Sequence, residues 1–314
     1  MHISDVAARL RSMDHVLILT HVRPDGDTIG CAAALCCALR RLGKEAYLLY
    51  NPGITSTYLP YAEPYWAPDG WQPEYVVSTD IAVLNLLPDN AAPYRERIAL
   101  AIDHHPSHSY FAAESYVDAS AAACGEILYA VIRELTPITA DIALPLYVAV
   151  STDTGCFVYS NTTPNTHRIA AELMACDIDA ASVNKALFRT KSKVRLRMEA
   201  HMAAHMELYD NDRVVVMQIP LSLRQEMQAT EADIEELSSL AALVEGTDCA
   251  ITLRELKVGT VKISARTGPR VNATEVCARL GGGGHRAAAG ATMSGTLDEV
   301  KQAVLQAVQE VVGA

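Results

Sequence analysis

The sequence lacks the features that mark membrane, secreted or repeat-containing proteins. None of its apolar runs approaches the length of a membrane span. Charged residues interrupt the first positions, which therefore resemble a helix leading into a strand more than a signal peptide. No internal repeat or low-complexity tract occurs. We therefore expect a cytoplasmic protein that does not act on membranes.

Paired cysteines and a surplus of positive charge are also missing. The 8 cysteines form no CxxC pair and no zinc-finger spacing, so buried free thiols are expected. The formal net charge is −11, whereas a protein that grips a long nucleic acid neutralises many phosphates with Lys and Arg. Long nucleic acids are therefore disfavoured as partners, and short or small anionic substrates remain.

The chain does contain enough apolar residues for a sizeable core. Of its 314 residues, 50% are hydrophobic and 20% are charged, and this length favours two domains. After Asn211 the sequence changes to short β-like runs. We predict an α/β protein in which a cleft separates the two domains: a parallel-sheet catalytic domain at 1–190, a helical linker at 191–210 and a smaller α+β domain at 211–314.

One stretch joins a buried strand to reactive side chains. Residues 98–105 run from apolar positions directly into Asp103, His104 and His105. A continuous apolar run suits a strand covered on both faces, and ligands bind beyond the carboxyl ends of such strands. The alternative is a solvated turn in which Asp103 caps a helix and the histidines are incidental.

An earlier strand ends in the same way. The apolar run at 15–20 leads into His21, Asp25 and Asp27, and a helix is predicted over 28–42, ending at the following glycine. A D-x-D pair alone is typical of a turn or a helix cap. The histidine four residues before Asp25 adds a nitrogen ligand to the oxygen pair and favours a metal site.

Two further aspartates follow apolar segments. The predicted strand at 75–79 ends on Asp80, and Asp153 follows a segment that ends at residue 150. A lone aspartate after a strand is usually a helix cap. Because the pattern recurs along one chain, it favours a shared site.

The remaining segments alternate between helical and β-like patterns. Residues 51–73, rich in Pro, Tyr and Gly, are predicted to be an irregular surface connection. Methionines spaced by four at 198–206 indicate packing. Other helices are predicted at 119–135, 139–150, 166–175, 183–188, 193–208, 272–280 and 297–312, and other strands at 45–50, 214–219, 249–253 and 260–265.

A run of four glycines precedes His285. Glycine loses more chain entropy on folding than other residues and contributes no side-chain packing, so four consecutive glycines call for a structural or functional explanation. Close approach to a ligand supplies one, because successive N–H groups form an anion-binding concavity to which His285 adds a donor or a charge. The alternative is a flexible interdomain loop.

The motifs together provide a ligand set without thiols. Carboxylates with some imidazole suit Mn²⁺ or Mg²⁺ better than structural Zn²⁺, and one bridging carboxylate allows such a set to hold two ions. Paired ions of this kind are suited to phosphoester hydrolysis. The candidate ligands are His21, Asp25, Asp27, Asp80, His104 and Asp153.

The same motifs resemble those of a known family. Four stretches of the chain resemble, in order, the four motifs of the DHH phosphoesterases: HVRPDGDTIG, the Asp80 of STD, IDHHPSH and STDTG. Two later stretches resemble the DHH-associated C-terminal domain: KISART and GGGGHRAAAG. The two-domain form is similar to the nanoRNase and pAp phosphatase group. The resemblance implies hydrolysis of very short oligoribonucleotides to mononucleotides and removal of the 3′-phosphate of adenosine 3′,5′-bisphosphate (pAp).

The resemblance also implies a role for each candidate residue. Two Mn²⁺ ions per chain, with Mg²⁺ left open, would share Asp80 as a bridging ligand. Asp103 would orient a histidine, and His105 would be the acid that contacts the substrate. The first ion would have His21, Asp25 and Asp80, and the second Asp27, Asp80, His104 and Asp153. The substrate's terminal phosphate or nucleotide would be held by Ser264, Arg266, Gly282, Gly283, Gly284 and His285.

Two departures and several alternatives leave the substrate open. Cys31 and Cys124 stand where the resemblance leads us to expect serine, and residues 81–87 lack the polar residues often found there. A cyclic di-AMP or pApA phosphodiesterase would use the same metals and the same C-terminal domain. A nucleotide-binding module without turnover is the alternative from another class, although every ligand position in the motifs is filled. A homodimer is also left open.

Overall fold

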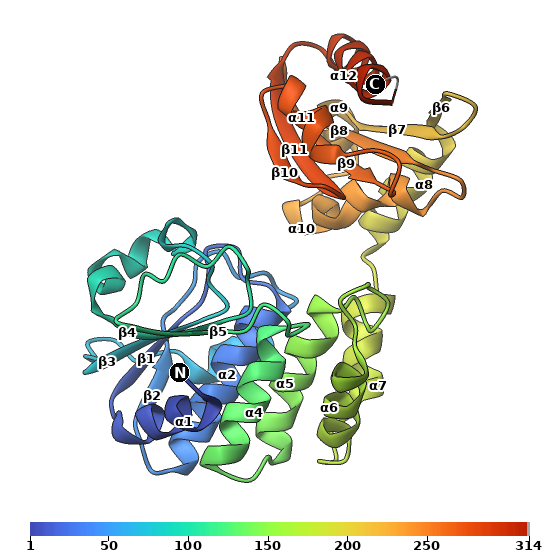
Figure 1. The fold of residues 1–314 in the computed structure, drawn as a ribbon. Coiled ribbons are helices and arrows are strands. Elements are labelled where there is room, and N and C mark those ends of the chain that lie inside the picture. The colour runs from blue at the N-terminus through green and yellow to red at the C-terminus, as the bar shows by residue number, and fades with distance from the viewer. Residues whose placement is uncertain (313–314) are drawn as a thin grey trace. The chain divides into compact units, whose positions relative to one another are not determined.

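A computed structural model describes residues 1–312 and divides the chain into two compact units (Figure 1). The N-terminal unit spans Met1–Thr190, and the C-terminal unit begins at Lys191. Each unit has its own sheet and its own apolar core. The division of the chain into functional domains at 1–190, 191–210 and 211–314 stays a prediction.

The N-terminal unit is built on a five-stranded parallel sheet in the order β2-β1-β3-β4-β5. This sheet confirms the predicted α/β class. Because β2 and β3 lie on opposite sides of β1, the chain reverses direction across the sheet there, and such switch points are where open sheets bind ligands. The strands are β1 (Val16–Leu19), β2 (Ala46–Leu48), β3 (Tyr75–Thr79), β4 (Ile98–Asp103) and β5 (Glu114–Val117).

Helix α2 (Gly26–Arg41) is the central helix of this unit. It is buried from Gly26 to Leu39 and begins at Asp25, whose side chain accepts hydrogen bonds from two backbone N–H groups of the first turn. Its neighbour is α5 (Ala140–Asp153), and a Cβ at Gly30 would lie only 2.3 Å from the Pro145 carbonyl oxygen. This close packing fixes the two helix ends that contribute to the site.

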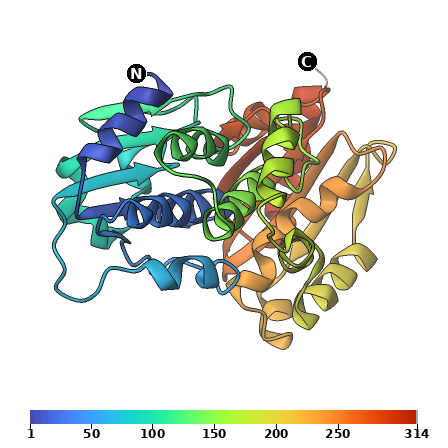
Figure 2. The same ribbon diagram turned by 90° about the horizontal axis from the view of Figure 1, so that it is seen from below.

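Helices and 3-10 segments cover the two faces of the sheet. The larger core lies between the sheet and α1, α2, α4 and α5. Helices α2, α4 and α5 run side by side in Figure 1, and Figure 2 shows α1 at the N-terminus, at an angle to them. A smaller apolar cluster on the other face includes Leu17, Val76 and Ile98. The other helical segments are α1 (Ile3–Ser12), α3 (Leu59–Ala62), η1 (Glu63–Tyr65), η2 (Leu84–Leu86), η3 (Asp89–Arg97), α4 (Cys124–Leu135), α6 (Pro164–Met174), α7 (Ala180–Asn184) and the π turn η4 (Lys185–Arg189).

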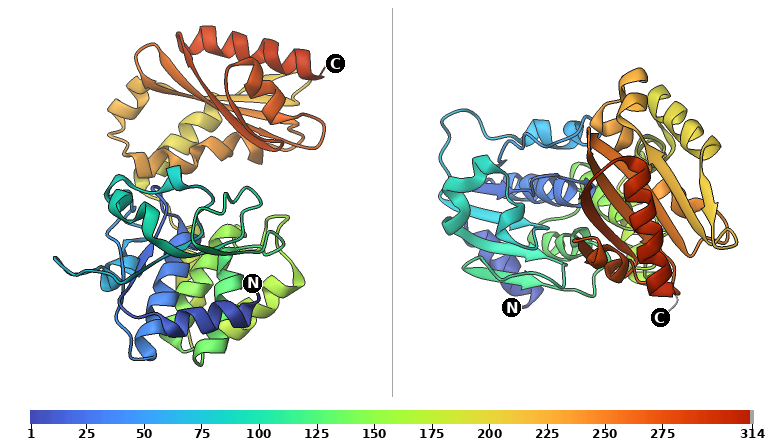
Figure 3. Two further views of the ribbon diagram at one scale, coloured as in Figure 1. Left: turned by 60° about the vertical axis from the view of Figure 1, so that its left-hand side comes forward. Right: turned by 90° about the horizontal axis from the view of Figure 1, so that it is seen from above.

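The C-terminal unit has a six-stranded mixed sheet in the order β10-β11-β9-β8-β7-β6. All neighbours are antiparallel except β7 and β8. Figure 3 (left) shows α12 on one face of this sheet and α8 on the other. The elements are α8 (Lys193–Ala204), β6 (Glu207–Tyr209), β7 (Val214–Ile219), α9 (Leu221–Glu226), α10 (Glu231–Ile234), η5 (Glu235–Leu243), β8 (Cys249–Lys257), β9 (Thr260–Thr267), α11 (Ala273–Arg279), β10 (Gly283–His285), β11 (Ala288–Ser294) and α12 (Leu297–Val312).

Two predicted helices and one predicted connection are among the elements that differ from the structure. The helix predicted over 119–135 begins only at Cys124, because Asp118 accepts hydrogen bonds from the backbone and hydroxyl of Ser120 and holds a turn there. The helix predicted over 193–208 ends at Ala204, because Leu208 pairs with Val215 in the sheet. The connection at 51–73 contains α3 and η1 and so is not wholly irregular.

Other predictions are confirmed. Met198 and Met202 are buried in the core between α8 and the sheet, as the spacing indicates, whereas Met206 is exposed. The cysteines are all free thiols, and only Cys156 and Cys176 are less than fully buried. No helix within residues 1–312 is both long enough and apolar enough to cross a membrane.

Candidate metal centre

The six candidate ligands converge at the carboxyl end of the N-terminal sheet. His21, Asp25 and Asp27 follow β1, the strand at the switch point. Asp80 follows β3 directly and His104 follows β4, while the last residue of α5 is Asp153. Ligand atoms of His21, Asp25 and Asp80 all lie within 4.8 Å of one another, and the same is true of Asp27, His104 and Asp153.

Asp80 lies between the two groups and faces both with different oxygens. Its Oδ2 is 3.9 Å from His21 Nε2, which is also 3.6 Å from Asp25 Oδ1. Its Oδ1 is 3.6 Å from His104 Nε2. One carboxylate thus faces a histidine of each group, a placement that suits a bridging ligand.

The second group is gathered around His104. Its Nε2 lies 3.9 Å from Asp27 Oδ2 and 3.6 Å from Asp153 Oδ2. Its Nδ1 lies 3.2 Å from the Ala121 carbonyl oxygen. A hydrogen bond donated by Nδ1 to that carbonyl leaves Nε2 unprotonated and able to ligate a cation.

Burial makes this cluster unfavourable without a counter-ion. Burial raises the pKa of Asp80 and of Asp27 well above the usual range, and the mutual repulsion of the carboxylates adds to the effect. Burial also raises the pKa of Asp153. Asp80 Oδ1 is buried and accepts no hydrogen bond within the described residues. A buried carboxylate oxygen without a partner fits a site for a hard cation.

The backbone at Asp80 also departs from ordinary strand geometry. Its φ is 59°, in the left-handed region, although the side chain is only 3% exposed. Strained backbone of this kind persists where the surrounding structure fixes it and is common at functional sites. The turn directs the carboxylate toward the histidines as the chain leaves β3.

Asp27 is held by hydrogen bonds from three directions. The backbone N–H of Cys124 donates to its Oδ2 at 2.7 Å, and the N–H of Gly125 donates to its Oδ1 at 2.9 Å, both from the first turn of α4. The thiol of Cys31 donates to Oδ1 at 3.2 Å. Burial raises the pKa of both thiols, that of Cys124 to about 11, so each remains protonated at neutral pH. Cys31 therefore acts as a hydrogen-bond donor to Asp27.

Asp103 lies beside the cluster and binds two imidazoles. It is fully buried, and its Oδ1 is 2.8 Å from His105 Nδ1, while its Oδ2 is 2.9 Å from His108 Nδ1. Burial opposes its ionisation, but these two contacts outweigh it and hold the pKa of Asp103 below the ordinary value. The hydrogen bond to Asp103 raises the pKa of His105.

The sequence did not single out His108. Its side chain is buried, and it packs near the rings of Tyr110 and Phe111. The signal in the sequence was its position as the third histidine of DHHPSH, five residues after Asp103.

Comparison with known proteins identifies the family. Two family models match the chain: DHH family, N-terminal domain, over residues 15–150, and DHHA1 domain over residues 211–314. A Thermus thermophilus protein named bifunctional oligoribonuclease and PAP phosphatase NrnA is 36% identical, over 94% of this chain and 89% of its own length. The chain belongs to the DHH family.

Further relatives agree with this assignment. A Streptococcus mutans protein named probable bifunctional oligoribonuclease and PAP phosphatase NrnA is 25% identical, over 91% of this chain and 92% of its own length. An exopolyphosphatase-related protein from Bacteroides fragilis has the same fold, with a TM-score of 0.89 and 21% identity over 99% of this chain and 96% of its own. As a DHH phosphoesterase, the chain is a metal-dependent hydrolase of phosphoester bonds.

The DHH motifs line a cavity of about 450 Å³. Its walls combine metal-ligand candidates with His105 and with three residues that the sequence did not assign, Val22, Arg23 and Leu86. The complete lining is His21, Val22, Arg23, Asp25, Asp80, Leu86, His105 and Asp153.

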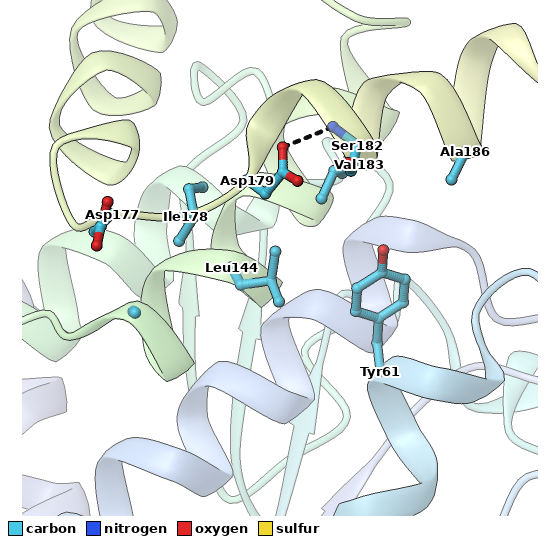
Figure 4. A pocket seen from close by; sticks show the side chains of 9 residues that line it. Tyr61, Leu144, Asp177, Ile178, Asp179, Ser182, Val183 and Ala186 are labelled. Carbon is cyan, nitrogen blue, oxygen red and sulfur yellow. Dashed lines mark hydrogen bonds between the residues drawn. The ribbon is translucent and has the colours of Figure 1, made fainter.

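A second cavity of about 450 Å³ lies apart from these motifs, between α5, α7 and α3. Figure 4 shows Tyr61 and Leu144 on one side of it and Asp179 on the other. The Asp179 carboxylate accepts a hydrogen bond from the Ser182 backbone N–H at 3.0 Å and caps α7. Its polar group is thus engaged in the helix, and the cavity shares no residue with the ligand cluster.

The predicted substrate-binding residues lie together in the DHHA1 domain. Ser264 and Arg266 are two residues apart on β9, so their side chains point to the same face. Strand β11 lies between β9 and β10, and Ala288 of β11 pairs with both Arg266 and His285. The structure therefore brings these residues onto neighbouring strands within one unit, and their role stays a prediction.

The glycine run is ordered backbone, which contradicts the alternative of a flexible loop. Gly283 and Gly284 belong to β10 and pair with β11. A Cβ at Gly282 would lie 2.1 Å from the Gly290 carbonyl oxygen, and one at Gly284 would lie 2.6 Å from Ala289 Cα. Two of the glycines are thus required by the close approach of β11, whereas Gly283 faces open space.

Proposed function

We propose that the chain hydrolyses very short oligoribonucleotides to mononucleotides and removes the 3′-phosphate of pAp. The observation that supports this most is the close relationship to the Thermus thermophilus enzyme, whose name includes both activities. That relationship extends over both units of this chain. It therefore includes the residues proposed for chemistry and those proposed for substrate binding.

The site suits two divalent cations, and we propose Mn²⁺ as the ion. His21, Asp25 and Asp80 would hold one ion, and Asp27, His104 and Asp153 would hold the other together with Asp80. All donors are carboxylate oxygens or imidazole nitrogens, which suits Mn²⁺ and Mg²⁺. When bound, paired cations activate water near neutral pH and neutralise charge on the phosphoryl oxygens.

His105 is proposed to protonate the leaving oxygen. Its Nδ1 is bound to Asp103, which orients the ring and stabilises its protonated form. Its side chain is 40% exposed and lines the cavity that contains the ligand cluster. The proton on Nε2 is therefore available to a substrate, while Asp103 acts only through the position and charge of the imidazole.

Substrate binding by the DHHA1 domain is the second part of the proposal. The guanidinium of Arg266 offers a planar fork that suits phosphate oxygens. His285 is exposed at the end of the glycine run and can add a further donor. We propose that Ser264, Arg266, Gly282, Gly283, Gly284 and His285 bind the phosphate or nucleotide that is not cleaved.

Substrate turnover tests the proposed function directly. The Mn²⁺-loaded chain is assayed in parallel on pAp, pApA, a five-nucleotide RNA, a thirty-nucleotide RNA and cyclic di-AMP. We expect turnover of pAp and of the short RNA, and a steep fall in rate with RNA length, because the acidic surface repels a long phosphate backbone. A clear preference for cyclic di-AMP over pAp would assign the chain to the phosphodiesterase alternative.

Variants in the DHHA1 domain test the second part. Arg266→Ala and His285→Ala should each weaken substrate binding by about 1.5–3 kcal/mol while leaving metal content unchanged. If the remote phosphate also aligns the reacting bond, kcat falls as well. The matched control is Lys257→Ala, which removes a cation at the opposite end of the β8–β9 pair from Arg266. Loss of bound Mn²⁺ in either variant, or wild-type kinetics in both, would contradict the assignment.

A further inference from the structure

Arg23 is the one arginine or lysine among the lining residues of the cavity at the ligand cluster, which also include two histidines. The same cavity contains Asp25, Asp80 and Asp153. Its guanidinium nevertheless forms no hydrogen bond or ion pair with any residue in the described part of the chain. An unpaired arginine beside several carboxylates is unusual, because such pairs normally form bidentate contacts.

The backbone that leads into Arg23 is held by contacts of the two residues before it. The side-chain amide of Asn51, itself only 2% exposed, donates a hydrogen bond to the His21 carbonyl oxygen at 2.7 Å. The N–H of Val22 donates to the Leu86 carbonyl oxygen at 2.6 Å. Gly53 packs so closely on the Val22 carbonyl that a Cβ would lie 2.2 Å from it. The backbone next to Arg23 is therefore held in place, while its guanidinium has no partner among the described residues.

The wall next to Arg23 is apolar. Val22 and Leu86 are each 38% exposed and line the same cavity. Exposed apolar side chains at a polar site provide a surface for the uncharged part of a ligand, such as a ribose or a base. The lining of the cavity thus combines carboxylates that suit cations with one guanidinium and two apolar side chains.

We propose that Arg23 binds a second, non-cleaved phosphate of the substrate and thereby determines specificity. The inference rests on the proposed function and adds a contact from the N-terminal unit to those proposed in the DHHA1 domain. Negative charge on the substrate would otherwise approach a cluster of carboxylates, and the guanidinium offsets that repulsion for one phosphate. Substrates with two phosphate groups should therefore be preferred over analogues with one.

Matched substrates isolate this contact. Turnover is measured on pAp and on adenosine 3′-monophosphate, and on diadenylate with and without its 5′-phosphate. Arg23→Ala should lower kcat/KM on the two substrates that carry the extra phosphate by about 10- to 150-fold, the range for one charge-assisted hydrogen bond. The two analogues without it should be hydrolysed at wild-type rates. Arg23→Lys keeps the charge without the fork and should give an intermediate loss.

A binding measurement keeps the test independent of turnover. The hydrolysis-resistant 3′-methylenephosphonate analogues of pAp and of adenosine 3′-monophosphate are titrated calorimetrically into the Mn²⁺-loaded chain. Wild type should bind the first more tightly than the second, and Arg23→Ala should remove that difference. Arg168→Ala, which removes a cation on α6 outside the cavity, should behave as wild type.

The outcomes separate the two proposals. If wild type does not hydrolyse pAp or short RNA, the proposed function fails, and the binding titration still decides the role of Arg23. An equal loss on all four substrates would instead place Arg23 at the cleaved phosphate and overturn the inference. Unchanged kinetics and unchanged binding in Arg23→Ala would overturn it as well.

Discussion

His108 Nδ1 lies 2.9 Å from Asp103 Oδ2, on the other oxygen of the carboxylate that binds His105. Asp103 is fully buried and therefore cannot turn toward solvent. His108 thus holds one oxygen of the Asp103 carboxylate, while His105 contacts the other oxygen and lines the cavity. The orientation of the proposed acid depends on a residue that has no contact with the cavity.

His108→Ala should therefore reduce kcat without changing KM. We expect a loss of about 10- to 100-fold in turnover, the usual effect of removing a group that orients a catalytic or ligand residue. The free energy of unfolding should fall by about 2–4 kcal/mol, because the substitution leaves a space and an unpaired carboxylate oxygen. Urea denaturation and steady-state kinetics measure both effects. His205→Ala, at an exposed position in the C-terminal unit, is the control and should change neither.

Removal of the proposed bridging carboxylate should abolish turnover. Asp80→Ala and Asp80→Asn each remove a ligand from both proposed ions, so activity should fall to background and the content of bound metal should fall with it. Elemental analysis and turnover on pAp measure this. Asp89→Ala, at an exposed position, should keep both. An active Asp80→Asn enzyme with unchanged metal content would exclude the two-ion arrangement.

Metal removal should lower the thermal stability of the wild-type chain. A cation that binds only the folded state stabilises it by about 2.7 kcal/mol at a concentration of one hundred times Kd. Chelation should therefore lower Tm, and added Mn²⁺ should restore it in proportion to the logarithm of its concentration. In Asp80→Asn the metal dependence of Tm should be much weaker. Full turnover in chelator, or equal Tm with and without metal, would contradict a resident cation.

A carboxylate in the C-terminal unit should give stability a specific pH dependence. Burial opposes the ionisation of Glu207, but hydrogen bonds from Tyr209 and from Lys301 Nζ at 3.0 Å outweigh it and hold its pKa below the ordinary value of 4.5. Its contribution is therefore fully present above pH 4.5 and is lost as the pH falls through the lower folded-state pKa. Because Glu207 is partly exposed, we expect Glu207→Gln to cost only about 1 kcal/mol at pH 7.

The pH series is the decisive measurement for Glu207. The difference between wild type and Glu207→Gln should shrink as the pH falls below 4.5, because unfolding of the wild type is then increasingly accompanied by proton uptake at Glu207. Asp298→Asn removes a more exposed partner of the same lysine and should change stability little at any pH. A difference that stays constant down to pH 3 would show that Glu207 acts through packing.

Neighbouring glycines on β10 should respond differently to the same substitution. Gly284 has a φ of 145° and no room for a Cβ beside Ala289, so Gly284→Ala should destabilise the chain by about 2–3 kcal/mol. Gly283 has open space, and Gly283→Ala should change stability by less than about 0.5 kcal/mol. If the proposed phosphate site is correct, Gly283→Ala should still raise KM for pAp, which steady-state kinetics will show.

Much of the N-terminal unit follows from local sequence patterns. The apolar runs before Asp80 and Asp103 predict β3 and β4, and Asp25 marks the beginning of α2 because it can cap the first turn. Parallel strands present their carboxyl ends at one edge, so residues that follow different strands were expected to meet. The six ligand candidates do lie together there.

The features that the sequence did not reveal depend on contacts between distant segments. Strand β5 is only partly buried and has no continuous apolar run, so nothing local distinguishes it from a loop. The pairing of β10 with β11 determines which glycines are required, and that pairing is tertiary. His108 has a role only because the loop after β4 returns it to Asp103.

Position 80 is subject to two independent requirements. Its φ of 59° favours glycine, asparagine and aspartate over other side chains, because the last two tolerate the left-handed region. The ligand cluster requires a carboxylate at the same place. Glutamate meets the second requirement but not the first, and asparagine meets the first but not the second. In a saturation library at this position, selection for folding and selection for turnover should therefore retain different residues. Aspartate alone should be retained under both selections.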